Sequence, residues 1–371
     1  MKKNEMEIVF FMPSIESGGV EKNLFIIGNF IAKNTKYTKI ITADSKYNNY
    51  FRNIEVISPK INLSNSRGRK LKYIFCLVEL FKLILKNKKI LVFSFQANLY
   101  CIVLCKIFFD IKIIVRANSS STGWSKSAIK KFIFKKILRL ADKIIVNSID
   151  FKKEFKRDLN IDTKCIYNPL DRERIIRLSK EKIKFPFFQK YKKILKIVNV
   201  GRLVDQKDQL TLLRALKIIK NKVPFKALFI GTGKNRTNMQ NFIDENNLKK
   251  DVKILPFKKN PFSYINLADT LILSSIYEGL PNVLLEALVL KKFIISSDCP
   301  TGPREILSNG KGGMLFKPKD YSHLAKKISF YFYNKKKLLI NIKYANKKLN
   351  RFDSEINLNK YLHLVRKESN K

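Results

Sequence analysis

The chain alternates short apolar runs with longer amphipathic segments, and this alternation constrains its fold more than any other feature. Short apolar runs bounded by turn residues are typical of buried strands, and helical spacing between them is typical of helices that cover a sheet. This order predicts a parallel sheet with helices on its faces. In the first half we expect strands at residues 8–12, 40–42, 54–57, 90–95, 111–116, 143–147 and 165–167, and helices at 20–33, 70–86, 126–140 and 151–159.

The alternation is interrupted once, at Lys182–Lys193 (KIKFPFFQKYKK), where proline and clustered charge break both periodicities. It resumes with strands expected at residues 194–200, 226–230, 252–255, 270–273, 293–296 and 314–316, and helices at 210–220, 236–246 and 281–290. At 371 residues the chain fits two domains of ordinary size. We therefore predict an α/β protein with two Rossmann-like doubly wound domains facing a cleft that holds the ligand. The predicted domains are residues 1–185 and 186–345, and a helical segment follows at 346–371, with a place back on the first domain left open.

Basic residues dominate the charge of the chain. Seventy-five Lys and Arg residues against 30 Asp and Glu give a formal net charge of +45. Codon bias would raise Glu together with Lys, so it leaves part of this excess unexplained. The excess predicts a polyanionic partner, which is a phosphorylated substrate, an anionic membrane surface or a nucleic acid.

The cysteines and the apolar runs point to the cytosol. Five cysteines without a CxxC pair favour neither a disulfide framework nor a zinc site, and Cys101 and Cys105 are expected to be core thiols. The longest apolar runs fall short of the roughly 18 to 20 residues that a membrane span needs. Glu7 opens the first apolar stretch, which indicates a strand rather than a signal peptide.

Two loops that follow predicted strands could bind an anion. Gly18 and Gly19 lie between the first strand and the first helix, where backbone N–H groups and the helix N-terminus favour an anion, although a tight turn explains the pair equally well. Gly201, Arg202 and Lys207 lie on the loop after the first strand of the second domain. A guanidinium and an ammonium suit a diphosphate, and a solvated surface is the alternative.

The most specific segment is Ser274–Asn282 (SSIYEGLPN), which follows a strand and precedes an apolar helix. Glu278 lies in this loop and Glu286 lies inside the helix. A carboxylate in so apolar a helix needs partners, and sugar hydroxyls are suitable ones. The loop Ser297–Ile306 (SDCPTGPREI), rich in proline and glycine, is either part of the site or a rigid turn.

Together the segments ESGGVEK, GRLVDQKD, IGTGKNR, SSIYEGLPNVLLEAL and SSDCPTGPREIL resemble the retaining glycosyltransferases of family four, which have the GT-B fold. They also resemble bacterial enzymes that add sugars to polyprenyl-diphosphate-linked or surface-polysaccharide acceptors. The resemblance covers nearly the whole chain. It implies transfer of a sugar, expected to be a UDP-linked hexose or N-acetylhexosamine, from a nucleotide-diphosphate donor to a glycan or lipid-linked acceptor.

The resemblance also implies roles for single residues. Glu278 would hold hydroxyls of the donor sugar and Glu286 those of the ribose, while Arg202 and Lys207 would neutralise the leaving diphosphate, which makes Glu278, Arg202 and Lys207 the catalytic set. The other donor-binding positions implied are Gly18, Gly19, Gly201, Gly233, Gly279, Leu280, Asn282 and Val283. Because the chain has no Asp-x-Asp motif, neither a metal nor another cofactor is expected.

Some positions depart from the family pattern, and other functions stay open. The family often has a histidine after the fifth strand of the first domain, where this chain has Arg116 and Asn118 as stand-ins. Pro256 and Lys292-Phe293 replace common glycine turns and put the base pocket in doubt. The alternatives are a sugar-nucleotide epimerase, a polyanion-binding protein and an inactive scaffold of the same fold; nucleic acid is not the expected partner, because it leaves the glutamate pair unexplained.

Two basic segments with apolar centres predict attachment at the inner face of the plasma membrane without a span. They are Arg67–Lys89 and Trp124–Arg139, and the second has apolar residues at helical spacing with lysines off that stripe. The alternative is that the apolar stripe covers its own sheet. Acceptor specificity is expected in the loops Ser58–Arg69 and Asn118–Lys126.

Overall fold

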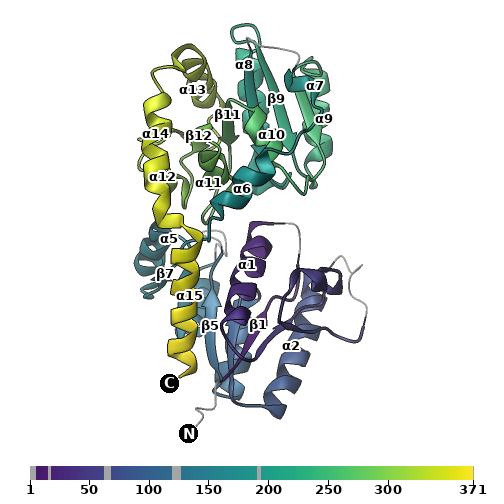
Figure 1. The fold of residues 1–371 in the computed structure, drawn as a ribbon, viewed down its shortest axis with the longest axis vertical. Helices are drawn as coiled ribbons and strands as arrows, with labels where there is room; N and C mark the ends of the chain where they lie inside the picture. The colour runs from purple at the N-terminus through teal and green to yellow at the C-terminus, as the bar shows by residue number, and fades with distance from the viewer. Residues whose placement is uncertain (1–5, 16–17, 62–67, 119–126, 190–193, 371) are drawn as a thin grey trace. The chain divides into compact units, whose positions relative to one another are not determined.

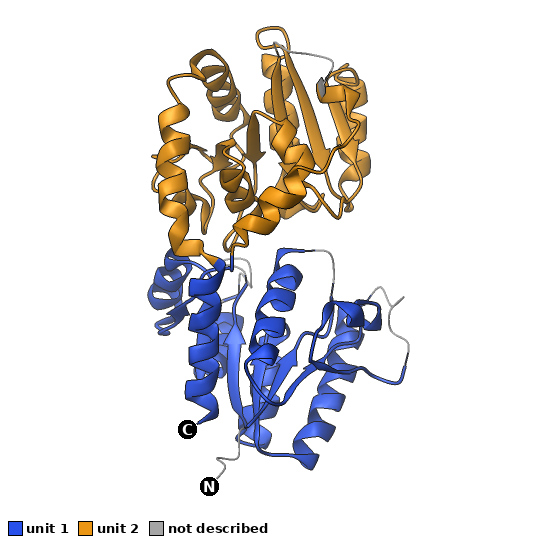
Figure 2. Ribbon diagram, viewed as in Figure 1, with its two compact units in different colours: residues 1–169, 354–371 blue, residues 170–353 orange. Residues whose placement is uncertain are grey.

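The computed structural model describes residues 6–15, 18–61, 68–118, 127–189 and 194–370. The chain divides into two compact units, shown in different colours in Figure 2. Unit 1 comprises Met1–Pro169 and Ser354–Lys371, and unit 2 comprises Leu170–Asp353. Each unit is described by itself.

Unit 1 is built on a seven-stranded parallel sheet with strand order β3-β2-β1-β4-β5-β6-β7 (Figure 1). The strands are β1 (Glu7–Phe11), β2 (Thr38–Ile41), β3 (Glu55–Ile57), β4 (Ile90–Ser94), β5 (Lys112–Arg116), β6 (Lys143–Val146) and β7 (Lys164–Cys165). The helices are α1 (Gly19–Lys33), η1 (Ser45–Tyr50), α2 (Arg69–Lys86), α3 (Asn98–Ile102), η2 (Val103–Phe108), α4 (Ala128–Leu138), α5 (Ile149–Glu154), η4 (Phe155–Leu159) and α15 (Ser354–Ser369). Each strand follows an apolar run of the sequence, because a strand buried on both faces has no polar side.

Side chains of opposite parity along these strands enter two different cores. Val9 and Ile113 pack with α2, α3, η2, α4 and α5 on one face, and Cys101 and Cys105 are buried there, as the sequence predicts. Ile8 and Ile114 pack with α1 and α15 on the other face. The sheet is therefore covered on both sides by helices.

Unit 2 has a six-stranded parallel sheet with strand order β10-β9-β8-β11-β12-β13. The strands are β8 (Leu195–Val200), β9 (Phe225–Ile230), β10 (Val252–Leu255), β11 (Thr270–Leu273), β12 (Phe293–Ser297) and β13 (Met314–Phe316). The helices are α6 (Arg172–Ser179), α7 (Pro186–Gln189), η5 (Asp205–Lys207), α8 (Gln209–Ile219), α9 (Arg236–Glu245), α10 (Phe262–Leu267), α11 (Asn282–Val289), α12 (Pro303–Ile306), α13 (Tyr321–Asn334), α14 (Leu339–Lys347) and η6 (Lys348–Phe352). The doubly wound α/β class predicted for both halves is confirmed.

The units meet at other positions than the sequence pattern indicates. The first boundary falls between Pro169 and Leu170 rather than at 185/186, because α6 packs on α10 of unit 2, where the Leu178 carbonyl accepts hydrogen bonds from Asn260 (2.9 Å) and Ser263 (3.1 Å). The second boundary falls between Asp353 and Ser354 rather than at 345/346. After it, α15 packs on α1 and β4 of unit 1.

Among the residues that the structure describes, no helix is both long and apolar enough to cross a membrane.

Candidate active site

Three neighbouring strands of unit 2 carry the polar loops of the candidate site. Strand β11 pairs in parallel with β8 on one side and with β12 on the other, so the loops after their carboxyl ends lie at one edge of the sheet. We name them by residues: the cation loop is Gly201–Asp208 after β8, the acid loop is Ser274–Pro281 after β11, and the brace loop is Asp298–Gly302 after β12.

Glu278 and Lys207 form an ion pair between the acid loop and the cation loop. The Lys207 Nζ lies 2.5 Å from the Glu278 Oε1, and the Ser275 hydroxyl donates to the same oxygen at 2.6 Å. The Glu278 side chain is only 8% exposed and that of Lys207 17%. A carboxylate this deeply placed requires such partners, so the two predicted catalytic residues lie together in the folded chain.

The brace loop fixes the backbone around Glu278. The Glu278 N–H donates to the Pro300 carbonyl at 2.6 Å, and the Thr301 N–H donates back to the Glu278 carbonyl at 3.2 Å. The Thr301 hydroxyl also donates to the Gly279 carbonyl at 3.1 Å. A Cβ on Gly302 would lie 2.3 Å from that carbonyl, so only glycine permits the close approach. This loop therefore acts as a support for the acid loop, and burial raises the pKa of its Cys299 to about 12.

Two glutamines that the sequence patterns did not single out hold the cation loop. The Gln209 side chain is buried and its Nε2 donates to the Arg202 carbonyl at 3.0 Å. The Gln206 Nε2 donates to the Tyr277 carbonyl of the acid loop at 3.0 Å. Arg202 is exposed, and its Nη2 lies 3.5 Å from the Gln206 Oε1. Their signal was position alone, since both glutamines flank a predicted basic residue.

The helix after the acid loop carries the second predicted glutamate. Helix α11 begins at Asn282, and Glu286 is buried among Leu284, Leu285 and Leu288. Leu280, which precedes the helix, is also buried, whereas Asn282 and Val283 in its first turn are half-buried. The predicted backbone donors therefore lie directly after Gly279, at the start of a helix whose N-terminus favours an anion.

Gly233 and Gly201 have different reasons for lacking a side chain. A Cβ on Gly233 would lie 2.2 Å from the Leu203 carbonyl oxygen, because the loop after β9 packs directly on the cation loop. A Cβ on Gly201 would lie 3.7 Å from the Lys207 Cε, which is an ordinary contact. Gly233 is therefore required for the packing of the two loops, whatever it adds to ligand binding.

Gly18 and Gly19, the predicted phosphate-binding pair, belong to unit 1. Helix α1 begins at Gly19, and Gly18 precedes it in an extended conformation. The chain before this turn is held by Asp44, whose carboxylate accepts from the Ile15 N–H at 2.8 Å and pairs with the buried Lys72 at 2.7 Å. The turn thus starts a helix of 15 residues at the carboxyl end of β1.

Arg116, the candidate to replace the family's histidine, is fully buried in unit 1. It donates to the Tyr361 hydroxyl at 3.1 Å, to the Asn168 amide oxygen at 2.5 Å, and to the Asn118 amide oxygen. Asn118 is half-buried and donates to the Phe95 carbonyl at 2.8 Å. Arg116 therefore ties β5 to α15, and of the two residues only Asn118 has exposed surface.

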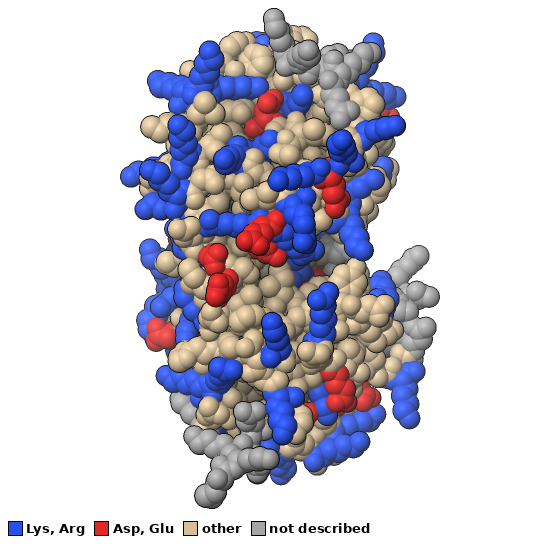
Figure 3. Space-filling model, viewed as in Figure 1, with Lys and Arg blue, Asp and Glu red and all other residues tan. Residues whose placement is uncertain are grey.

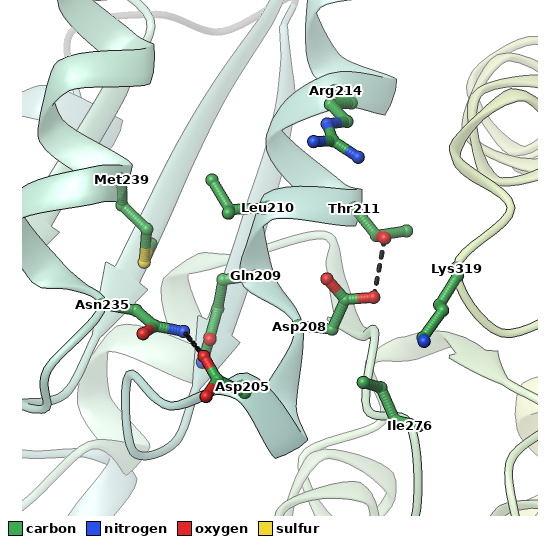
Figure 4. A pocket seen from close by; sticks show the side chains of 10 residues that line it. All are labelled: Asp205, Asp208, Gln209, Leu210, Thr211, Arg214, Asn235, Met239, Ile276 and Lys319. Carbon is green, nitrogen blue, oxygen red and sulfur yellow. Dashed lines mark hydrogen bonds between the residues drawn. The ribbon is translucent and has the colours of Figure 1, made fainter.

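A cavity of about 300 Å³ lies beside the cation loop (Figure 4). Its lining includes Asp205, Asp208 and Lys319, with the Thr211 hydroxyl donating to the Asp208 Oδ2 at 2.7 Å. Hydrogen bonds, chiefly from Lys234, lower the pKa of Asp205, whereas burial raises the pKa of Asp208. Within the described ranges no group of three His, Cys, Asp or Glu side chains is arranged to hold a metal ion.

Comparison with known proteins identifies relatives for much of the chain. The profile of a family described as "Glycosyl transferases group 1" matches residues 180–348. A protein of Methanocaldococcus jannaschii named an uncharacterized glycosyltransferase is 34% identical over 202 residues, which are 50% of this chain and 50% of that protein. The N-acetylgalactosamine-N,N'-diacetylbacillosaminyl-diphospho-undecaprenol 4-alpha-N-acetylgalactosaminyltransferase of Campylobacter jejuni is 29% identical over 192 residues, 51% of this chain and 50% of that enzyme. The matches thus span about half the length of both relatives.

Among solved structures, HepE of Anabaena in complex with UDP-glucose superimposes with a TM-score of 0.77. The alignment covers 98% of this chain and 100% of that chain at 18% identity. The GT-B fold predicted from the sequence is therefore confirmed.

Proposed function

We propose that this chain, which belongs to the group 1 glycosyl transferases through residues 180–348, moves a sugar from a UDP-sugar to a glycan or lipid-linked acceptor with retention of configuration. The observation that carries the proposal is the pair of Glu278 and Lys207 at the carboxyl edge of the unit 2 sheet, with Arg202 on the same loop. Open α/β sheets bind their ligands at this edge. A carboxylate for sugar hydroxyls and two cations for a diphosphate are the groups that a nucleotide sugar needs.

The chemistry centres on the charge that develops on the leaving diphosphate. Fixed cations at this position stabilise the transition state more than the ground state, and such electrostatic stabilisation is usually the largest catalytic contribution. Lys207 and Arg202 supply the cations, and the N-terminus of α11 adds N–H donors. Glu278 binds hydroxyls of the donor sugar, and Glu286 binds those of the ribose. In the free protein Lys207 already neutralises Glu278, so the donor diphosphate competes for a cation that is held in place.

The donor and acceptor classes draw support from the relatives. The Campylobacter jejuni enzyme acts, by its name, on a diphospho-undecaprenol-linked sugar and transfers N-acetylgalactosamine. The HepE structure contains UDP-glucose. We therefore propose a UDP-linked hexose or N-acetylhexosamine as donor and a polyprenyl-diphosphate-linked or polysaccharide acceptor. Two cations stand where a metal would hold the diphosphate, so we also propose that activity persists in a chelator.

A thermal-shift panel of UDP-, GDP- and ADP-sugars, followed by donor hydrolysis measured with and without chelator, tests the proposal. We expect one UDP-sugar to raise the melting temperature and to be hydrolysed slowly without an acceptor. If no nucleotide sugar shifts the melting temperature and none is hydrolysed, the protein is a binding or scaffold protein of this fold. Loss of hydrolysis in chelator that added metal restores would overturn the metal-independent mechanism.

We further propose that unit 1 attaches to an anionic bilayer at the cytoplasmic side of the plasma membrane. Helices α2, η2 and α4 pack on one core, and their outward sides expose large apolar residues. These residues form what we name the lipid face: Leu71, Ile74, Val78, Phe81 and Leu85 on α2, Ile107 and Phe108 on η2, and Ile129, Phe132 and Ile133 on α4.

Lysines accompany the apolar side chains of the lipid face. Lys82 and Lys86 on α2 and Lys130, Lys131 and Lys136 on α4 are exposed. Basic residues near an anionic membrane contribute about 1 kcal/mol each, and the apolar residues can enter the headgroup boundary. Lys and Arg also outnumber acidic residues over the surface visible in Figure 3. Trp124 and Lys126, which belong to the same sequence segment, lie outside the described residues.

Sedimentation with lipid vesicles tests the attachment. We expect binding to vesicles that contain phosphatidylglycerol at low salt, weaker binding at high salt, and little binding to neutral vesicles. A double variant with Ile129→Ser and Phe132→Ser should bind less, whereas Tyr37→Ser, which removes an exposed aromatic ring of unit 1 outside the lipid face, should bind like the wild type. Equal sedimentation with neutral and anionic vesicles contradicts the proposal.

A further inference from the structure

Gln206 lies on the cation loop and reaches the acid loop with both its side chain and its backbone. Its Nε2 donates to the Tyr277 carbonyl at 3.0 Å, and its own carbonyl accepts from the Ile276 N–H at 2.8 Å. These contacts precede Glu278 directly in the chain. Gln206 thus joins the loop that carries Arg202 and Lys207 to the loop that carries Glu278.

The other end of the same amide group faces Arg202. The Gln206 Oε1 lies 3.5 Å from the Arg202 Nη2, at the outer limit of a hydrogen bond. One amide therefore uses its donor on the acid loop and its acceptor on a cation of its own loop. Among side chains of this length, only glutamine offers both groups without charge: glutamate would lose the donor, and methionine would lose donor and acceptor.

A second contact joins the loops, but it does not hold the same residues. The Ser274 hydroxyl donates to the Lys207 carbonyl at 3.0 Å, which ties the start of the acid loop to the end of the cation loop. Without the Gln206 amide the two loops would keep this connection and the ion pair of Lys207 with Glu278. The part set free would be the Tyr277 backbone together with the Arg202 guanidinium.

We propose that Gln206 is a positioning residue that fixes the diphosphate-binding cations relative to the sugar-binding glutamate. The proposal rests on the function proposed above. In that function a nucleoside diphosphate contacts the cation loop, whereas a nucleotide sugar engages both loops at once. Losing the Gln206 amide should therefore impair sugar transfer much more than it impairs binding of UDP alone.

The test compares Gln206→Met, Gln206→Glu and a control, Gln240→Met, in the full chain. Gln240 is exposed on α9 and its Nε2 donates only to Asp244 in the described structure, so the control removes an amide of equal size outside both loops. For each protein we would measure the kcat and KM of UDP-sugar hydrolysis or transfer, the Kd of UDP by calorimetry, and the melting temperature. The wild type is measured first, because a wild type without activity on any UDP-sugar would refute the proposed function and not this inference.

We expect kcat to fall on the order of 10- to 100-fold in both Gln206 variants, which is the scale of a small misplacement of reacting groups. The Kd of UDP should change less than about threefold, a small effect on affinity, and the melting temperature should match that of the control. Glutamate retains the acceptor for Arg202, so wild-type activity in Gln206→Glu with a loss only in Gln206→Met would show that the contact with Tyr277 is not what matters. Unchanged kcat in both variants, or parallel losses of kcat, UDP affinity and melting temperature, would also overturn the proposal.

Discussion

Lys207 and Glu278 meet across two loops through a contact of 2.5 Å, and the Ser275 hydroxyl completes the surroundings of the carboxylate. The two residues are 71 positions apart in the chain. Each depends on the other for its charge to be tolerated away from water. Replacing either one therefore affects the free protein as well as the chemistry.

Glu278→Gln should abolish transfer while the fold stays intact. The amide has the same size, and its oxygen can still accept from Lys207 and Ser275, so the loop keeps its partners. The negative charge that orients the sugar hydroxyls is lost. Turnover of the true donor, measured beside the circular dichroism and melting temperature of the purified variant, checks this; retention of most wild-type turnover would remove Glu278 from the catalytic set.

Lys207→Ala and Arg202→Ala should each weaken binding of UDP by about 1.5–3 kcal/mol, the range for hydrogen bonds to charged groups. The two variants should differ in the free protein. Lys207→Ala leaves the buried Glu278 without its cation and should lower the free energy of unfolding by about 1–3 kcal/mol, whereas the exposed Arg202 contributes little.

Calorimetry with UDP and urea unfolding without ligand separate these two effects. The combination Lys207→Ala with Glu278→Gln should recover part of the lost stability, because no buried charge then remains unpaired. Equal UDP affinity in wild type and both single variants would exclude these cations from the diphosphate site.

Gly233→Ala and Gly201→Ala form a matched pair, since both glycines are predicted donor-binding positions. The new methyl group at 233 would meet the Leu203 backbone and force the loops apart, at a cost of about 1–3 kcal/mol of stability. At 201 it would make an ordinary contact with Lys207, and the free energy of unfolding should stay within about 0.5 kcal/mol of wild type. Urea unfolding of the two variants side by side provides the check, and equal stability would contradict it.

Asp208→Asn should stabilise the protein at neutral pH. Burial raises the pKa of Asp208 above its ordinary value of 3.8, so the folded chain holds this proton more tightly than the unfolded chain does. The contribution of Asp208 to stability therefore falls as the pH rises from 3.8 through the raised folded value, and the ionised group is unfavourable above it. Asparagine avoids this charge, still accepts from Thr211, and suits the left-handed backbone at φ 44°.

The dependence on pH distinguishes the charge from the backbone effect. We expect the difference in melting temperature between Asp208→Asn and wild type to be largest near pH 7 and to shrink toward pH 4. A difference that is the same at every pH would come from the backbone alone.

Sequence patterns predict the strands of this chain well because each is an apolar run buried on both faces. Expected strands at 90–95 and 143–147 correspond to β4 and β6, and similar agreement holds in unit 2. The patterns fail for α6, whose eight residues carry too few apolar positions to fix a period. The residues that bind α6 to unit 2 lie far along the chain, at Asn260 and Ser263, so the domain boundary was placed too late.

The candidate site divides in the same way. Glu278, Glu286, Arg202 and Lys207 stand out in the sequence because charged residues beside strand ends are unusual and specific. Gln206 and Thr301 do not, because their roles depend on backbone carbonyls that only the fold brings within reach. The buried position of Arg116 was likewise hidden, since its partner Tyr361 lies 245 residues away.

Helix α15 has a consequence for how the protein is made. Tyr361 and Val365 are wholly buried in unit 1, yet they leave the ribosome only after all of unit 2 has been synthesised. Domains tend to fold in the order in which they emerge, and here that order is reversed for completion. Unit 2 is one uninterrupted segment and can fold first, while the nascent unit 1 waits with one face of its sheet lacking a helix. A ribosome stalled near residue 353 should therefore carry a finished second unit and a first unit that chaperones still recognise.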